Sequence, residues 1–289
     1  MQRIDSLLDI ADSADTFFID VFGVLWDGAA FYPKAVTVCE KLMEKGKHIY
    51  ILSNTTTVSA HFKEKHIKNG FIQGVHYTDV ISSGDVLKYK LENEAFMDEV
   101  CGSKKGKYLL IGRTNDQLLE SVLPRQTLDV NEASAVYFGS LQEKNGNHLI
   151  LYETTEKFEP LAQKALDRKL PAICSNPDYF AFNKGFRYVT QGNLAKWYED
   201  HGGKVYWIGN PYKNIYDFAL KKANAQPAQS IMVGDTIRTD ILGGFNAGMK
   251  TVLIVGYGIT QDKLNAGQTL EEVEKEEGAT PDFILEGLK

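Results

Sequence analysis

The sequence lacks several features that would assign it to particular classes of protein. Its three cysteines lie far apart and form no C-x-x-C pair, which suits a reducing compartment better than a disulfide framework. No uninterrupted apolar stretch approaches the length that spans a membrane, and the first residues contain no apolar core of a signal peptide. We therefore expect a cytoplasmic protein that does not associate with membranes.

An excess of positive charge is also missing. The formal net charge is −6 at pH 7, which disfavours a nucleic-acid-binding face. The six histidines show no metal-ligand spacing, and no internal repeat or low-complexity tract is visible. What remains is a composition of 43% hydrophobic and 24% charged residues, which is ordinary for a soluble globular protein.

Apolar runs alternate with helix-like patterns in the first and last parts of the chain. The strand candidates there are 17–20, 48–53, 204–208, 230–235 and 251–255, and the helix candidates are 35–45, 58–69, 214–222 and 240–247. An alternation of strands and helices favours a parallel sheet with helices on both faces. We therefore predict an α/β fold with a doubly wound parallel-sheet core.

The middle of the chain shows an alternation of its own. Its strand candidates are 80–82, 108–111, 135–138 and 172–174, and its helix candidates are 84–91, 116–123 and 157–169. The simplest account is a second α/β domain inserted into the first. We predict a core domain formed by 1–78 and 190–289 and an inserted domain at 79–189. No linker rich in Gly, Pro or Ser marks the boundaries.

Acidic residues follow two of the apolar strand candidates. Asp20 follows the first, Asp235 follows a later one, and Asp240 comes five residues after Asp235. Open α/β sheets place their chemistry at the carboxyl ends of the strands. Mg²⁺ prefers carboxylate, carbonyl and water oxygens. We predict a Mg²⁺ site formed by Asp20, the backbone carbonyl of Phe22 and Asp235, with Asp240 holding a metal-bound water or the start of a helix.

Such a site suits phosphoryl transfer, with Asp20 as the covalent nucleophile. An aspartate can attack a phosphoryl group only if a cation and fixed donors offset the repulsion between the two anions. Ser53 ends a third strand candidate, and its hydroxyl and the amide of Asn54 could hold phosphoryl oxygens. Helix capping by the threonines at 55–57 is a second interpretation, and the two do not exclude each other.

The chain contains the segments D-V-F-G-V-L-W-D-G (20–28), L-S-N-T-T (52–56), G-N-P-Y-K-N-I-Y (209–216) and V-G-D-T-I-R-T-D-I-L-G-G-F-N-A-G (233–248). These four segments resemble the haloacid dehalogenase-like superfamily of phosphatases, class IIA. This branch has a large α/β cap and includes enzymes similar to p-nitrophenyl, nucleotide and sugar phosphatases. The resemblance implies that Asp20 is nucleophile and metal ligand, that Ser53 binds the transferring phosphoryl group, and that Asp235 and Asp240 serve the Mg²⁺ shell.

The resemblance also implies that the cap selects a small phosphorylated substrate. A closing domain supplies groups that the core lacks. The segment Ser175–Asp178 is similar to the family's substrate loop, so Asn176 and Asp178 are candidate substrate-binding residues. Asn54 would orient neighbouring groups. The cap is in addition a candidate surface for a homodimer.

Two positions depart from the family's pattern. The first motif usually reads Asp-x-Asp, and its second Asp moves a proton to the leaving group, which Phe22 cannot do. Such help is worth about 10²–10⁴-fold, and its loss weighs most on alkyl phosphates. Asp27 could replace this acid or could cap a turn. The third motif usually reads Gly-Lys-Pro, but position 210 is Asn. Lys213 could supply the charge or be an exposed lysine in a first helical turn, and Asn210 could donate a neutral hydrogen bond.

Three functions remain open from these residues. The retained carboxylates favour a Mg²⁺-dependent phosphatase acting through an aspartyl-phosphate. Phe22 and Asn210 favour a degenerate member that binds a phosphorylated ligand or acts in regulation. Cleavage of a C–P bond would need a cap lysine that forms an imine, and the sequence does not single one out.

Overall fold

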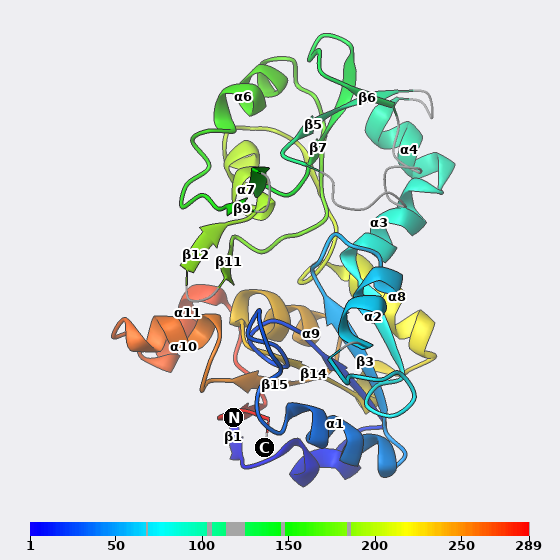
Figure 1. Ribbon diagram of the computed structural model, residues 1–289, viewed down its shortest axis with the longest axis vertical. Helices are drawn as coiled ribbons and strands as arrows, with labels where there is room; N and C mark the ends of the chain where they lie inside the picture. The colour runs from blue at the N-terminus through cyan, green and yellow to red at the C-terminus, as the bar shows by residue number, and fades with distance from the viewer. Residues whose placement is uncertain (68, 103–105, 114–124, 146–147, 184–185, 289) are drawn as a thin grey trace. The chain divides into compact units, whose positions relative to one another are not determined.

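The chain folds into two compact units. The computed structural model describes residues 1–67, 69–102, 106–113, 125–145, 148–183 and 186–288 (Figure 1). The first unit comprises Met1–Ser53, Ser59–Ile81 and Asn210–Lys289, and the second comprises Asn54–Val58 and Ser82–Gly209. Each unit contains its own parallel sheet and helices. The predicted fold class, an α/β core interrupted by an inserted α/β unit, is confirmed.

The first unit contains a seven-stranded sheet with the order β1-β16-β15-β14-β2-β3-β4. Its strands are β1 (Gln2–Ile4), β2 (Thr16–Ile19), β3 (His48–Ser53), β4 (Asp79–Ser82), β14 (Ser230–Gly234), β15 (Lys250–Ile254) and β16 (Phe283–Leu285). Every pair from β1 to β3 in this order is parallel. The helices of the unit are η1 (Leu7–Ser13), α1 (Ala35–Glu44), α2 (Ser59–Ile67), α8 (Lys213–Ala223), η2 (Pro227–Gln229), η3 (Ile237–Ile241), α9 (Leu242–Asn246), α10 (Ile259–Asn265) and α11 (Leu270–Glu277).

Apolar side chains cover both faces of this sheet. Phe17 and Ile19 of β2 belong to one buried cluster, which also contains Leu42 of α1. Leu253 of β15 belongs to another cluster, together with Val273 of α11. Burial of apolar surface on both sides favours the parallel arrangement and leaves the strand ends as the places for polar side chains.

The second unit is built around a five-stranded parallel sheet with the order β13-β10-β7-β5-β6. Its strands are β5 (Lys107–Ile111), β6 (Arg125–Thr127), β7 (Ala133–Phe138), β10 (Ala172–Cys174) and β13 (Val205–Trp207). Two antiparallel hairpins are formed by β8 (Glu143–Asn145) with β9 (His148–Ile150) and by β11 (Phe180–Asn183) with β12 (Phe186–Val189). The helices are α3 (Ser83–Leu91), α4 (Glu94–Cys101), α6 (Glu159–Asp167) and α7 (Gln191–Asp200).

The boundaries of the inserted unit differ from the predicted 79–189. Strand β4 lies in the first sheet, so the insertion begins at Ser82. Strand β13, which we assigned to the core, pairs with β10 of the second sheet, so the insertion ends at Gly209. Strand partners are chosen by tertiary hydrogen bonding, which an apolar run does not reveal. The predicted helix at 116–123 lies outside the described residues.

None of the described helices combines the length and the apolar character needed to cross a lipid bilayer.

Candidate functional site

The strand order of the first sheet reverses between β2 and β14. From β2 the chain continues outward through β3 and β4, whereas β14 is followed on the other side by β15 and β16. Such a reversal opens a crevice beyond the carboxyl ends of the two strands. Asp20 follows β2 and Asp235 follows β14 at that point. The backbone N–H of Asp20 donates to the carbonyl of Val233 at 2.9 Å, which holds the two strand ends together.

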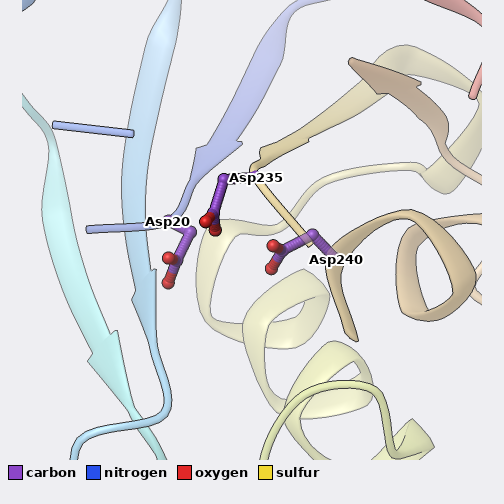
Figure 2. A group of neighbouring side chains, drawn as sticks. All are labelled: Asp20, Asp235 and Asp240. Carbon is purple, nitrogen blue, oxygen red and sulfur yellow. The ribbon is translucent and has the colours of Figure 1, made fainter. Parts of the chain in front are cut away.

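Three carboxylates converge at this crevice. Asp20, Asp235 and Asp240 each offer an oxygen atom, and these atoms lie within 4.8 Å of one another (Figure 2). Asp235 and Asp240 are only 4% and 2% exposed, and Asp20 is partly buried. Ionised carboxylates this close repel one another and lose hydration, so a bound cation would stabilise them. The all-oxygen donor set fits a hard divalent cation such as Mg²⁺.

Asp235 is held by donors and by close backbone packing. Its Oδ2 accepts a hydrogen bond from the backbone N–H of Ile259 at 2.6 Å. Gly23 and Gly258 have φ of +73° and +86°, and a Cβ atom at either position would lie 2.3 or 2.0 Å from Oδ2. Glycine alone fits both the backbone conformation and the space. The sequence gives no sign that these two glycines contact Asp235, although Gly23 stands three residues after Asp20 in the segment D-V-F-G.

Asp240 is held at both carboxylate oxygens. Its Oδ2 accepts from the backbone N–H of Thr236 at 3.1 Å, and its Oδ1 accepts from Nδ2 of Asn210 at 2.5 Å. The carbonyl of Thr236 accepts from the N–H groups of both Asp240 and Ile241, as in a π-helical turn. A Cβ atom at Gly234 would lie 2.1 Å from the Asp240 side chain. The predicted helix at 240–247 therefore begins with this wider turn, which presents Asp240 to the other carboxylates.

Asn210 connects Asp240 to a buried tyrosine. The hydroxyl of Tyr216 donates to Oδ1 of Asn210 at 2.5 Å, while Asn210 itself is only 4% exposed. Burial is the main cause that raises the pKa of Tyr216 well above its usual value, and the charges of Asp240 and Asp20 add to it. Tyr216 is therefore a protonated donor at neutral pH. The structure places a neutral hydrogen-bond donor at position 210, which is one of the two interpretations left open by the sequence.

Lys213 lies at the exposed start of α8, where its side chain pairs with Asp217. It is the first residue of α8, and its side chain is 83% exposed. Its Nζ lies 2.5 Å from Oδ1 of Asp217, one turn along the same helix. This placement does not favour Lys213 as a catalytic residue. It supports the alternative, an exposed lysine in a first helical turn.

Asp27 caps a turn, which is one of the two interpretations left open by the sequence. Its Oδ1 accepts from the backbone N–H groups of Ala29 and Ala30, both at 2.7 Å. The bond from Ala30, followed by that from Ala29, lowers the pKa of Asp27 below its usual value. A carboxyl group that is held ionised in a turn is a poor proton donor. Phe22 itself is 48% exposed, which is unusual for a phenylalanine.

Ser53 lies at the carboxyl end of β3, next to β2, and is 3% exposed. The residue after it begins a polar network in the second unit. Nδ2 of Asn54 donates to Oδ1 of Asp178 at 2.9 Å, and Oδ1 of Asn54 accepts from the Ser83 hydroxyl at 3.2 Å. Oδ1 of Asn176 accepts from the N–H of Asp178 at 3.0 Å. The structure thus connects the three predicted substrate-binding residues.

Comparison with known families gives two matches of the same kind. Residues 17–121 match the family model of haloacid dehalogenase-like hydrolases, and residues 207–289 match the model described as HAD-hydrolase-like. The two matches include all three carboxylates and Ser53.

Curated relatives resemble nearly the whole chain. The chain is 25% identical over 254 residues to the ribonucleotide monophosphatase NagD of Escherichia coli K12, which covers 86% of this chain and 90% of that protein. It is 24% identical over 262 residues to bovine (Bos taurus) chronophin, covering 86% and 83% of the two chains.

A solved structure with the same fold is that of a hydrolase of the haloacid dehalogenase-like family from Brucella suis 1330. It matches 99% of this chain and 100% of its own, with a TM-score of 0.81 and 23% identity. A p-nitrophenyl phosphatase from Archaeoglobus fulgidus matches 95% and 97% of the two chains with a TM-score of 0.65 and 21% identity.

Proposed function

We propose that this chain, which belongs to the haloacid dehalogenase-like hydrolases, is a Mg²⁺-dependent phosphatase of a small phosphorylated metabolite. The observation that carries the proposal is the convergence of Asp20, Asp235 and Asp240 at the reversal point of the sheet. Three carboxylates at this point could hold a cation beside a nucleophile. Without a cation, their mutual repulsion and lost hydration would destabilise the folded state.

Asp20 is the proposed nucleophile. One of its oxygens attacks phosphorus, the bond from phosphorus to the leaving oxygen breaks, and an aspartyl-phosphate forms. A water molecule then attacks that phosphorus, which releases phosphate and restores the carboxylate. Mg²⁺, held by Asp20, Asp235 and the carbonyl of Phe22, would neutralise phosphoryl charge when bound. Ser53 would hold a phosphoryl oxygen from the neighbouring strand end.

The leaving group has to depart without a proton from position 22. A leaving oxygen that is already acidic needs no such proton, whereas an alkoxide does. We propose that aryl and acyl phosphates are turned over more readily than alkyl phosphates. The exposed ring of Phe22 would then be an apolar neighbour of the reacting group instead of its acid.

The second unit would recognise the remainder of the substrate. Asn54, Asn176 and Asp178 are the proposed contacts, because the hydrogen bonds between them give one rigid polar group. The names of similar proteins point to different substrates, so a nucleotide, a sugar phosphate and phosphoglycolate are compounds to compare.

The test compares the wild type with Asp20→Asn on p-nitrophenyl phosphate, acetyl phosphate and a sugar phosphate, each with Mg²⁺. We expect Asp20→Asn to lose at least about 10³-fold in kcat, since a nucleophile cannot be replaced by a neutral amide. Asp129→Asn is the matched control, because Asp129 is an exposed aspartate of the second unit whose Oδ1 accepts from the backbone N–H and the side-chain amide of Asn131. Equal rates for the wild type and Asp20→Asn would contradict the nucleophile.

A second candidate is a degenerate protein that binds a phosphorylated ligand or regulates a partner. Phe22 and the neutral Asn210 favour it, because both remove groups that support turnover. Calorimetry with inorganic phosphate in the presence of Mg²⁺ separates the two. Binding of phosphate with no turnover on any substrate of the panel would favour this second candidate.

A further inference from the structure

Asn210 and Tyr216 form a buried chain of hydrogen bonds that ends on a carboxylate of the site. Tyr216 is fully buried, and its hydroxyl lies 2.5 Å from Oδ1 of Asn210. Nδ2 of Asn210 lies 2.5 Å from Oδ1 of Asp240. Neither nucleophilic attack by Asp20 nor coordination of Mg²⁺ requires these two hydrogen bonds. Both are buried, where a polar atom without a hydrogen bond would lower the stability of the folded state.

The chemistry of the three groups fixes the direction of every bond. An ionised carboxylate can only accept, so the amide of Asn210 must present its N–H to Asp240. The amide oxygen then faces Tyr216, which must donate its hydroxyl hydrogen. Tyr216 can do so because its raised pKa keeps it protonated. The chain of donors therefore runs from Tyr216 through Asn210 to Asp240.

The residues around these hydrogen bonds leave little room for the side chains of Tyr216, Asn210 and Asp240 to move. A Cβ atom at Gly243 would lie 2.4 Å from the Tyr216 hydroxyl and 2.6 Å from Oδ1 of Asn210. The second oxygen of Asp240 is held by the N–H of Thr236. With one oxygen bound to Asn210 and the other to the loop, the carboxylate has a fixed plane. Its remaining lone pairs point in fixed directions, which is what an octahedral Mg²⁺ shell needs from a supporting carboxylate.

We propose that Asn210 and Tyr216 are positioning residues that fix Asp240 and thereby set the Mg²⁺ affinity of the carboxylate site. We call the hydrogen bonds from Tyr216 through Asn210 to Asp240 the relay; it brings no positive charge to the three carboxylates. It therefore favours binding of a divalent cation, and it gives up attraction for the phosphoryl anion that a lysine at position 210 would supply. This inference rests on the proposed Mg²⁺ site.

The test measures Mg²⁺ binding to the full chain by calorimetry, without substrate. Tyr216→Phe removes the hydrogen bond from the Tyr216 hydroxyl to Oδ1 of Asn210, and we expect Mg²⁺ to bind about 10-fold more weakly, the size of effect typical of residues that orient metal ligands. The KM for p-nitrophenyl phosphate at saturating Mg²⁺ should stay within about twofold. Tyr198→Phe is the matched control, since Tyr198 is a buried tyrosine of the second unit whose hydroxyl donates to the carbonyl of Leu170. It should leave Mg²⁺ binding unchanged.

A second variant separates positioning from a general loss of packing. Asn210→Leu has nearly the same shape and removes the hydrogen bonds of Asn210 with Asp240 and Tyr216, so it should weaken Mg²⁺ binding at least as much as Tyr216→Phe. If Tyr216 acts through Asn210, adding Tyr216→Phe to Asn210→Leu should change Mg²⁺ affinity no further. A second, additive loss in the double variant would overturn the relay.

Charge provides an opposite and independent signal. Asn210→Lys should weaken Mg²⁺ binding and lower the KM for p-nitrophenyl phosphate, because the ammonium group repels the cation and attracts the anion. The thermal midpoint of each variant is measured alongside, and only folded variants are compared. If the wild type binds no Mg²⁺, the proposed function fails. If the wild type binds Mg²⁺ and Tyr216→Phe binds it equally well, the relay fails and the proposed function stands.

Discussion

In both units, parallel strands end in short polar segments at one edge of a sheet, and the two edges differ in what those segments do. In the second sheet, the segments after β5 and β7 bind each other, because the N–H groups of Arg113 and Ser140 donate to each other's carbonyls at 2.9 and 2.8 Å. The hydroxyls of Ser175, after β10, and Tyr137 share a hydrogen bond of 2.9 Å. These polar groups satisfy one another.

In the first sheet, the segments after β2 and β14 instead bring acidic side chains together. Asp20, Asp235 and Asp240 offer oxygens within 4.8 Å, and the groups around them are donors and glycines that fix their positions. The comparison teaches that a parallel sheet supplies a suitable edge, whereas the first few residues after each strand decide whether that edge becomes a reactive site. The following experiments test whether the two sheet edges differ in function as they do in structure.

After the loss expected for Asp20→Asn, the largest expected change comes from restoring an acid at the edge of the first sheet. We expect Phe22→Asp to raise kcat/KM for an alkyl phosphate by about 100-fold and to change that for p-nitrophenyl phosphate much less, because only the alkyl leaving group needs a proton. Phe245→Asp is the matched control, since Phe245 is also an exposed phenylalanine of the first unit. A parallel change for both substrates, or none for the alkyl phosphate, would show that proton transfer does not limit the reaction.

The next effect tests whether the glycines beside Asp235 serve the metal. In Gly258→Ala the new Cβ would meet Oδ2 of Asp235 at 2.0 Å, so the carboxylate has to move, and we expect Mg²⁺ to bind about 10- to 100-fold more weakly in calorimetry. Gly267→Ala has a similar φ, +97°, with nothing within 4 Å of the new Cβ, so it shares the backbone strain and not the clash. Weaker Mg²⁺ binding in both variants would point to strain as the cause.

A smaller effect is expected from the carboxylate of the second unit. Asp178→Asn should raise the KM for the best substrate of the panel by about 10-fold, as expected for loss of a hydrogen bond to a charged group. It should leave kcat within about twofold. Asp200→Asn is the control, because Asp200 pairs with Lys196 at an exposed helix end. A fall in kcat comparable to that of Asp20→Asn would remove the distinction between the two edges.

The smallest effect concerns stability at β4, where the first sheet leads into the second unit. Asp79 binds Lys63 and Lys222. Partial burial raises the pKa of Asp79, but the hydrogen bonds from Lys63 and Lys222 outweigh it, and the net pKa is lowered. The folded state therefore gains stability from the ionised form above the unfolded pKa of about 3.9, and loses it as the pH falls further.

We expect Asp79→Asn to lower the free energy of unfolding by about 1 kcal/mol at pH 7, and by progressively less as the pH falls below about 4. Chemical denaturation at several pH values measures this difference. Asp15→Asn is the control, since Asp15 is exposed and its Oδ1 lies 3.9 Å from Nζ of Lys47, so this ion pair should contribute little to stability. A destabilisation that does not depend on pH would contradict an electrostatic origin.

Much of the site could be predicted from local sequence. Asp20, Ser53 and Asp235 were found because each follows an apolar strand, and parallel strands place such residues at one edge. The turn-capping alternative for Asp27 and the neutral donor at Asn210 were also available from the residue types. The pairing of Lys213 with Asp217 could not be predicted, because the direction of a side chain at a helix start depends on which face of that helix packs against the sheet.

Other features could not be read from the sequence. The boundaries of the inserted unit depend on which sheet takes β4 and β13, and a short apolar strand carries no label for its partner. Gly258 gives no sign that its hydrogen lies against Asp235, because the two are far apart along the chain. The contact between Tyr216 and Asn210 also depends on how α8 packs beside α9, which brings Gly243 against both side chains.

The sequence by itself determined the α/β class, the insertion and the kinds of groups available at the strand ends, because strand and helix periodicity and the residues that follow them are local properties. The tertiary structure decided which of those groups meet. It brought Asp240 to Asp20 and Asp235 through a π-helical turn, turned Lys213 toward Asp217, and connected Tyr216 to Asp240 through Asn210. These outcomes depend on packing between segments far apart in the chain, where burial selects one arrangement among many that the local sequence allows.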